Sequence, residues 1–252
     1  MDMLKRYSVP LYIVITVVLS FAAYFLSLPV ESRALLVPVV LVFVPNVVCI
    51  PLAYFTEGKD GLRQLFSKAN GGLKWLLIGA MAGTLMRVAV LVTGSMLGMP
   101  VKADFSVPGT WFVVFATIPL AYFEEVGWRR FALDRMLKSR SPVESALLLG
   151  LPWALIHLVV IMPGMMSVGA PAIPQTIVLV CLGIILTWAY VRSGGSVLTV
   201  TLLHGIQNGL VVLNRGLSIS DATWLMMGVY LVLAILIVVF DRHMFFAKPS
   251  VN

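Results

Sequence analysis

Two adjacent glutamates, Glu124 and Glu125, close an apolar stretch in the segment YFEEVGWRRF at 122–131. Two histidines stand within other apolar stretches, His157 in PWALIH and His204 in HGIQN. Carboxylates and imidazoles are the side chains that most often take a proton from water during hydrolysis. A carboxylate at membrane depth costs roughly 2.5 to 3.5 kcal/mol on insertion scales unless it is paired or used in chemistry. These residues therefore predict water activation, provided that the apolar stretches cross a membrane.

The spacing of the polar residues predicts which of them act together. At about 3.6 residues per turn, His204 and Asn208 lie one above the other on one helix face and can bind one small group. Glu125 and Arg129 are also four residues apart and can form an ion pair, whereas Glu124 is rotated by about 100° and faces elsewhere. We therefore expect unequal roles, with Glu124 as the general base and Glu125 as a support for the site.

Trp153 and Arg87 are further candidates at membrane depth. Trp153 precedes His157 by one helical turn, so its indole can shield the imidazole from lipid or shape a pocket. Arg87 can neutralise the glutamates, bind a substrate carboxylate or compensate another buried polar group. Each polar residue taken alone has a structural explanation, because amides within spans often join helices, at about 0.6 kcal/mol each. That explanation does not account for two histidines and a carboxylate together.

The composition indicates a polytopic membrane protein. Of 252 residues, 60% are hydrophobic and 12% are charged, and a water-soluble domain of this length could not bury such long apolar runs. A membrane-spanning helix needs about 20 mostly apolar residues. We expect an all-α fold of about eight transmembrane helices in one domain, residues 1–252, enclosing a polar cavity open to the cytoplasmic side. The apolar runs are 9–28, 34–55, 75–99, 107–126, 143–163, 173–191, 195–213 and 222–240.

Lysine and arginine predict the orientation, because they concentrate in cytoplasmic loops. With the N-terminus inside, fourteen fall in cytoplasmic segments, and only Arg33, Lys102 and Arg215 fall in outer loops. Both termini are then cytoplasmic, and we expect the protein in a prokaryotic plasma membrane. The net charge of +7 follows from this topology and from attraction to anionic lipid headgroups. The lipid bilayer is therefore an expected partner, and nucleic acid is not.

Three smaller features complete the map. Segment 61–70 places apolar residues on one helical face and predicts a short helix lying on the membrane surface. Cys49 and Cys181 lie in apolar runs without a CxxC or His-rich companion, so they carry no disulfide or metal motif. The chain shows no internal repeat of the kind found in transporters.

Three motifs together resemble the signature of the CPBP intramembrane protease family, EExxxR, (F/W)xxxH and HxxxN/D. They are EEVGWR at 124–129, WALIH at 153–157 and HGIQN at 204–208, in the fourth, fifth and seventh apolar runs. The family includes CAAX prenyl endopeptidases and bacteriocin-processing or immunity proteins. The resemblance covers about residues 107–210, which we take as the motif-bearing catalytic core. It implies an intramembrane endopeptidase.

The resemblance also implies a role for each motif residue. Glu124 and His157 match the family residues thought to activate water. His204 and Asn208 match those thought to stabilise the oxyanion. The residues implied to support the site are Glu125, Arg129 and Trp153. The implied substrate is a membrane-anchored or amphipathic peptide or protein, either of the CAAX type or resembling a bacteriocin leader.

A divalent metal stays open as an alternative. Glu124, His157 and His204 are a donor set that could hold zinc with one position free for water. Against zinc, the sequence has no HExxH and no pair of histidines four residues apart to preform a chelate. Two other functions also stay open. A catalytically silent immunity or scaffold protein would keep the fold and the motifs, and a small transporter would keep charges within its spans.

Overall fold

The computed structural model describes residues 2–26, 33–67, 71–107, 109–165 and 167–248. Within these ranges the regular secondary structure is helical, apart from one isolated β-bridge between Lys102 and Arg215, and the expected all-α class is confirmed. The elements are α1 (Asp2–Arg6), α2 (Ser8–Leu26), α3 (Arg33–Phe66), α4 (Gly72–Met96), α5 (Thr110–Glu125), the π-helix η2 (Val126–Leu133), α6 (Asp134–Met136), α7 (Pro142–His157), the 3-10 helix η3 (Leu158–Ile161), α8 (Ala172–Arg192), α9 (Val197–Gly209), the 3-10 helix η4 (Leu210–Asn214), α10 (Ile219–Phe240) and α11 (Arg242–Phe245).

Seven helices in the described part of the chain are long and apolar enough to cross a membrane, rather than the eight expected. They are α2, α3, α4, α7 continued by η3, α8, α9 continued by η4, and α10. The remaining apolar run, 107–126, forms α5, which has only 16 residues. It falls short because α-helical geometry ends at Glu125 and the chain continues as the π-helix η2. The protein is a polytopic membrane protein.

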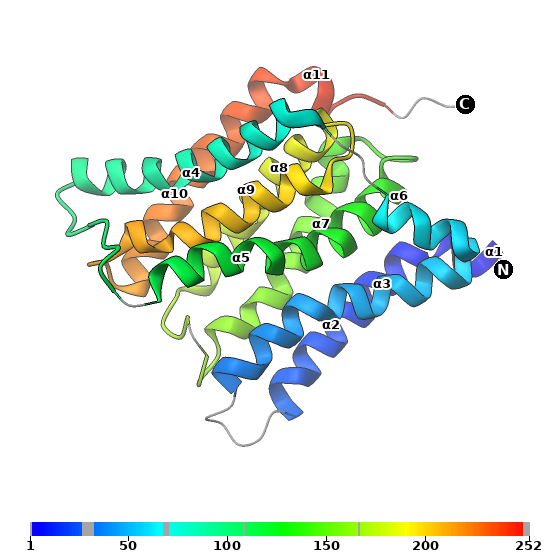
Figure 1. The fold of residues 1–252 in the computed structure, drawn as a ribbon, viewed down its shortest axis with the longest axis horizontal. Helices are drawn as coiled ribbons and strands as arrows, with labels where there is room; N and C mark the ends of the chain where they lie inside the picture. The colour runs from blue at the N-terminus through cyan, green and yellow to red at the C-terminus, as the bar shows by residue number, and fades with distance from the viewer. Residues whose placement is uncertain (1, 27–32, 68–70, 108, 166, 249–252) are drawn as a thin grey trace.

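Helix α9 is the most enclosed of these spans. In Figure 1 it runs between α4 and α5, and it packs closely against both of them. In its most apolar 18-residue stretch 67% is buried inside the protein, compared with 22% in the corresponding stretches of α2 and α10. Helices α7 and α8 pair with each other, and α10 packs on α8. The α2–α3 hairpin forms a separate group that reaches the bundle mainly through η2. The third motif of the sequence therefore lies on the central helix.

Two glycines allow α9 and α5 to approach backbone to backbone. A Cβ atom at Gly205 would lie 2.6 Å from Ile118 Cα, and one at Gly209 would lie 2.7 Å from Val114 Cα. The two glycines are four residues apart, the spacing of the GxxxG motif that permits close helix contact in membranes. The Thr117 hydroxyl donates across this contact to the Gly205 carbonyl at 2.8 Å. This packing fixes the distance between His204 on α9 and the glutamates on α5.

Helix η2 joins the hairpin to the bundle through aromatic packing. Tyr12 of α2 is fully buried and contacts the rings of Trp128 and Phe131 at centroid distances of 5.3 and 5.2 Å. Gly127 makes room for this contact, because a Cβ there would lie 2.6 Å from the Tyr12 hydroxyl and 2.7 Å from Pro45. The residues directly after the glutamate pair therefore fill the interface between the hairpin and the bundle.

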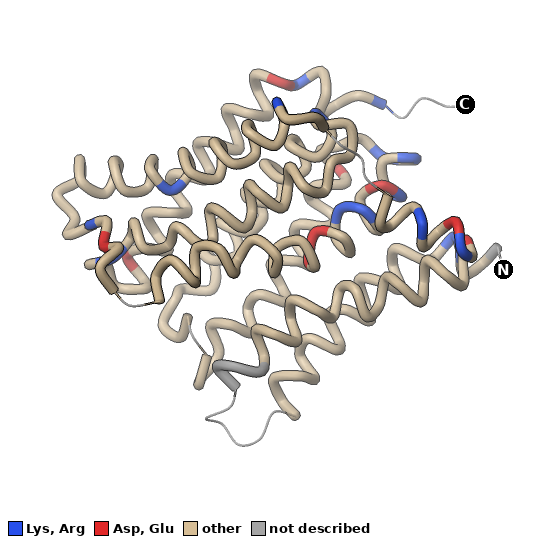
Figure 2. Tube along the Cα trace, in the orientation of Figure 1, with Lys and Arg blue, Asp and Glu red and all other residues tan. Residues whose placement is uncertain are grey.

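Most basic residues gather at one end of the molecule, where α1, α6 and α11 lie (Figure 2). We call this end the basic face; its lysines and arginines include Lys5, Arg6, Lys59, Arg63, Lys74, Arg130, Arg135, Lys138, Arg140, Arg192 and Arg242. Lys102 and Arg215 lie near each other at the opposite end. Lys68 and the side chain of Arg33 lie outside the described residues. The assignment of the basic face to the cytoplasm remains a prediction.

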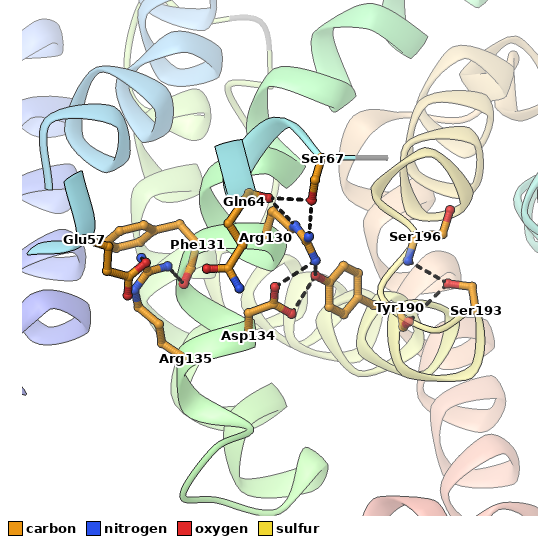
Figure 3. A network of polar contacts seen from close by, with 10 residues as sticks. All are labelled: Glu57, Gln64, Ser67, Arg130, Phe131, Asp134, Arg135, Tyr190, Ser193 and Ser196. Atoms are coloured by element: carbon orange, nitrogen blue, oxygen red, sulfur yellow. Dashed lines mark hydrogen bonds and ion pairs between the residues drawn. The ribbon is translucent and has the colours of Figure 1, made fainter. Parts of the chain in front are cut away.

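Polar contacts on the basic face hold the far end of η2 in place (Figure 3). Arg130 donates to Asp134 at 3.0 Å and to the Gln64 carbonyl at 2.8 Å, and the Tyr190 hydroxyl donates to Asp134 at 2.7 Å. Gln64 belongs to the final turns of α3, beyond a break in helical geometry at Gly58. The helix expected near residues 61–70 is thus present as far as Phe66, and residues 68–70 lie outside the described part of the chain. Its position on the membrane surface remains a prediction. The network ties this short helix and α8 to the π-helix.

The first prediction tests the contact between α5 and α9. Gly205→Ala should lower the thermal unfolding temperature, because overpacking a tight contact typically costs about 1 to 3 kcal/mol. Gly228→Ala is the matched control, since a Cβ at Gly228 meets nothing within 4 Å. Equal unfolding temperatures for the two variants would show that α5 and α9 do not pack as closely as described.

The second prediction concerns orientation. A reporter fused after Arg140, on the basic face, should score cytoplasmic, and one fused near Gly169 should score external, because basic residues concentrate in cytoplasmic segments. The reverse pattern at both positions would contradict the predicted orientation.

Candidate active site

Glu124 lies at the last turn of α5 and faces α7. Its Oε2 accepts a hydrogen bond from the Trp153 indole N–H at 3.3 Å and lies 4.0 Å from His157 Nε2. Glu124 is 8% exposed, and the His157 side chain is 19% exposed. The first and second motifs therefore meet across two helices, and the carboxylate and the imidazole lie close together without a direct hydrogen bond.

The backbone of α7 determines which nitrogen of His157 faces the carboxylate. His157 Nδ1 lies 2.8 Å from the carbonyl oxygen of Trp153, which can only accept a hydrogen bond. Nδ1 therefore carries the proton, and the neutral ring presents the Nε2 lone pair on the side of Glu124. A water molecule bound beside the pair could donate to both groups.

Glu125 is fully buried and contacts two cationic or donor side chains. Its Oε1 accepts from His204 Nδ1 at 2.7 Å, and its Oε2 lies 3.3 Å from Arg129 Nε. The expected ion pair with Arg129 is present, although its geometry does not qualify as a hydrogen bond. The contact with His204 was not predicted. Glu125 therefore connects the end of α5 to η2 and to the third motif on α9.

The Trp153 ring contacts both histidines and is 1% exposed. Its ring centroid lies 4.9 Å from that of His157 and 5.5 Å from that of His204, and both contacts are edge-to-face. The Arg129 guanidinium carbon lies 5.5 Å from the same ring. Trp153 thus contacts the carboxylate, both imidazoles and the arginine. Its role exceeds the expected shielding of His157.

Asn208 lies one turn beyond His204, and a chain of hydrogen bonds sets the orientation of its amide. The Tyr230 hydroxyl donates to Gln207 Oε1 at 2.8 Å, and Gln207 Nε2 donates in turn to Asn208 Oδ1. The Nδ2 amino group of Asn208 is then the end left to donate to a ligand. Asn208 is exposed, in contrast to the buried His204 and Gln207.

Arg87 lies behind α9, away from the glutamates. It is 6% exposed, and its Nε donates to the backbone carbonyl of Gln207, while its Nη1 lies 2.9 Å from Met226 Sδ. Of the three roles considered for Arg87, compensation of a buried polar group fits these contacts. A cation is favourable at this position because Gln207 lies in the last turn of α9, where carbonyls lack helical partners.

Asn46 is a further polar residue next to the site. Its Nδ2 donates to the carbonyl oxygen of Phe123, one residue before Glu124. The bond joins α3 to α5 close to the change from α-helix to π-helix. Asn46, Gln207 and Tyr230 were not among the candidate site residues. Asn46 and Gln207 stand out in the sequence as amides within apolar runs, but the sequence gives them no role in the site.

The three residues considered for zinc do not fit a metal site in this structure. Among the described residues, no three histidine, cysteine, aspartate or glutamate side chains converge closely enough to share an ion. We therefore derive no step through a metal. The polar cavity expected around these residues remains a prediction.

Comparison with known proteins agrees with the motif resemblance. Residues 106–210 match the family described as Type II CAAX prenyl endopeptidase Rce1-like. The chain is 27% identical over 206 residues to CAAX prenyl protease 2 of Methanococcus maripaludis, covering 75% of this chain and 74% of that protein. The matched segment contains all three motifs and every residue of the site described above except Asn46, Arg87, Met226 and Tyr230. Over this segment the chain is therefore similar to the Rce1-like type II CAAX prenyl endopeptidases, in agreement with the resemblance of its motifs to the CPBP intramembrane proteases.

Proposed function

We propose that the chain is an intramembrane endopeptidase that hydrolyses a peptide bond of a CAAX-type, membrane-anchored protein, with Glu124 as the base that activates water. The observation that carries this proposal is the juxtaposition of Glu124 Oε2 and His157 Nε2 at 4.0 Å. His157 donates its Nδ1 proton to the Trp153 backbone carbonyl. The Nε2 lone pair of His157 and the carboxylate of Glu124 are therefore two proton acceptors that face each other. A water molecule held there can lose a proton as it attacks.

The reaction can be written with these groups alone. Water bound between Glu124 and His157 attacks the carbonyl carbon of the scissile bond, and Glu124 takes the proton that water loses. The tetrahedral intermediate then collapses, the C–N bond breaks, and the proton passes from Glu124 to the departing amine. The products are a new carboxyl terminus and a new amine, with no covalent bond to the protein.

His204 and Asn208 are suited to stabilise the oxyanion of that intermediate. His204 donates Nδ1–H to Glu125. The buried carboxylate favours the doubly protonated ring, and in that form His204 presents Nε2–H on its other edge. Asn208 has its Nδ2 amino group free because Gln207 donates to its Oδ1. Donors aimed at a developing oxyanion in a site of low dielectric constant contribute several kcal/mol each, typically about 2.7 to 4.

The third prediction separates the two glutamates. Glu124→Gln keeps the size of the side chain but removes the base, so cleavage of a prenylated CAAX peptide should fall at least about 10²-fold, with little change in unfolding temperature. Glu125→Gln should instead lower stability by about 3 kcal/mol or more, because it leaves Arg129 and His204 without their buried partner. Its activity should fall mainly with the amount of folded protein.

Cleavage by purified Glu124→Gln protein at a near wild-type rate would contradict the assignment of Glu124 as the base. Zinc should be quantified in the same samples, and activity measured with and without a chelator. Loss of bound zinc together with activity in Glu124→Gln would identify the residue as a metal ligand. If the protein is a catalytically silent scaffold or immunity protein, the wild type should cleave nothing. Cells that carry Glu124→Gln should then behave as wild-type cells do.

The fourth prediction tests whether His204 and Asn208 serve one oxyanion. His204→Ala and Asn208→Ala should each lower turnover, and the double variant should lose much less than the product of the two losses, because residues that act as a unit are strongly non-additive. Turnover numbers from a double-mutant cycle measure this coupling. Independent losses would instead assign the two residues separate structural roles.

A further inference from the structure

Two cavities join to form one groove between α2 and α7. The first lies on the basic face and has a volume of about 570 Å³, and the second has the same volume and lies deeper along the helices. Ile13 and Val14 line both cavities, so the two adjoin each other along α2. Neither cavity is lined by Glu124, His157 or His204. The groove is thus distinct from the candidate active site.

The cavity on the basic face is strongly cationic. Five basic residues and one carboxylate line it: Lys5, Arg6, Arg135, Lys138, Arg140 and Glu57. Arg135 is neutralised by Glu57 at 2.9 Å and also donates to the Phe131 carbonyl, contacts that are visible in Figure 3. The other four cations are exposed and form no ion pair within the described part of the chain. Four exposed positive charges without a direct ion pair therefore line one opening.

The deeper cavity is almost entirely apolar. Its lining from α2 is Ile13, Val14, Val17 and Val18, and its lining from α7 and η3 is Leu151, Pro152, Leu155 and Leu158. Val14, Val18 and Leu151 are 58, 58 and 55% exposed, so the groove faces outward from the bundle. From residue 10 to residue 18, α2 rises about 12 Å, which is close to the roughly 15 Å hydrocarbon depth of one leaflet. The groove therefore has the length of an acyl chain in the leaflet next to the basic face.

We propose that this groove binds one anionic phospholipid, with its phosphate among the four free cations and an acyl chain along α2 and α7. Charge complementarity selects this occupant, because a zwitterionic headgroup leaves the positive charge of the first cavity uncompensated. Basic pockets at the membrane surface between transmembrane helices bind anionic headgroups by the same means. An ion such as free phosphate would satisfy the cations but would leave the apolar half of the groove empty.

The test is native mass spectrometry of the full-length, detergent-purified protein titrated with phosphatidylglycerol or phosphatidylcholine of identical chains. The wild type should retain one phosphatidylglycerol more tightly than any phosphatidylcholine. The variant Lys5→Gln/Arg6→Gln/Lys138→Gln/Arg140→Gln should lose this preference, with about fivefold weaker binding for each charge removed. The control variant Lys59→Gln/Arg63→Gln/Lys74→Gln/Arg242→Gln removes the same charge from the basic face outside the groove and should bind as the wild type does.

A second pair of variants tests the apolar half. Val14→Trp fills the groove and should weaken phosphatidylglycerol binding at least tenfold, whereas Val239→Trp on α10, at a residue 59% exposed, should not. Unfolding temperatures close to that of the wild type establish that each variant is folded. Equal retention of the two lipids by the wild type would overturn the proposal. So would displacement of the lipid by millimolar inorganic phosphate, or equal losses in the two charge variants.

Discussion

The arrangement of the site depends on one fully buried carboxylate, that of Glu125. An isolated charge in such a place would cost several kcal/mol, so it must be paired, and its two partners lie on different elements. Arg129 belongs to η2 and His204 to α9, so a single side chain fixes three elements relative to one another. Close contact through Gly205 and Gly209 brings α9 near enough for the pairing to form. The neighbouring Glu124 is then free of any ion pair with arginine or lysine in the described part of the chain.

Two adjacent glutamates acquire different environments from this arrangement. Glu125 is held by a cation and a histidine, and Glu124 faces α7, where Trp153 donates one hydrogen bond to it. The indole also contacts both His157 and His204 edge-to-face. In the proposed reaction the base with its water and the histidine suited to the oxyanion both lie next to Trp153. A membrane interior excludes bulk water, which makes such fixed polar contacts stronger than they would be in solution.

Much of the fold could be predicted from the sequence, because apolar runs of about 20 residues determine helices in a bilayer. The pairing of Glu125 with Arg129 follows from a spacing of four residues. The π-helix could not be anticipated, since the periodicity argument assumes α-helical geometry, and η2 forms where Gly127 packs against Tyr12 and Pro45. Contacts between side chains on different helices could not be predicted from the sequence either. The bond from Trp153 to Glu124 spans 29 residues, that from His204 to Glu125 spans 79, and neither leaves a local pattern.

The central claim is that water activated by Glu124 attacks the substrate directly. A single turnover in water enriched in oxygen-18, with enzyme in excess over a prenylated CAAX peptide, tests it most directly. The account predicts one heavy oxygen in the new carboxyl terminus of the first product and none in the carboxylate of Glu124, as read from mass spectra of the peptide and of the digested enzyme. Unlabelled product together with one heavy oxygen in the carboxylate of Glu124 after this single turnover would mean that this carboxylate attacks the substrate as a nucleophile, and would contradict the account.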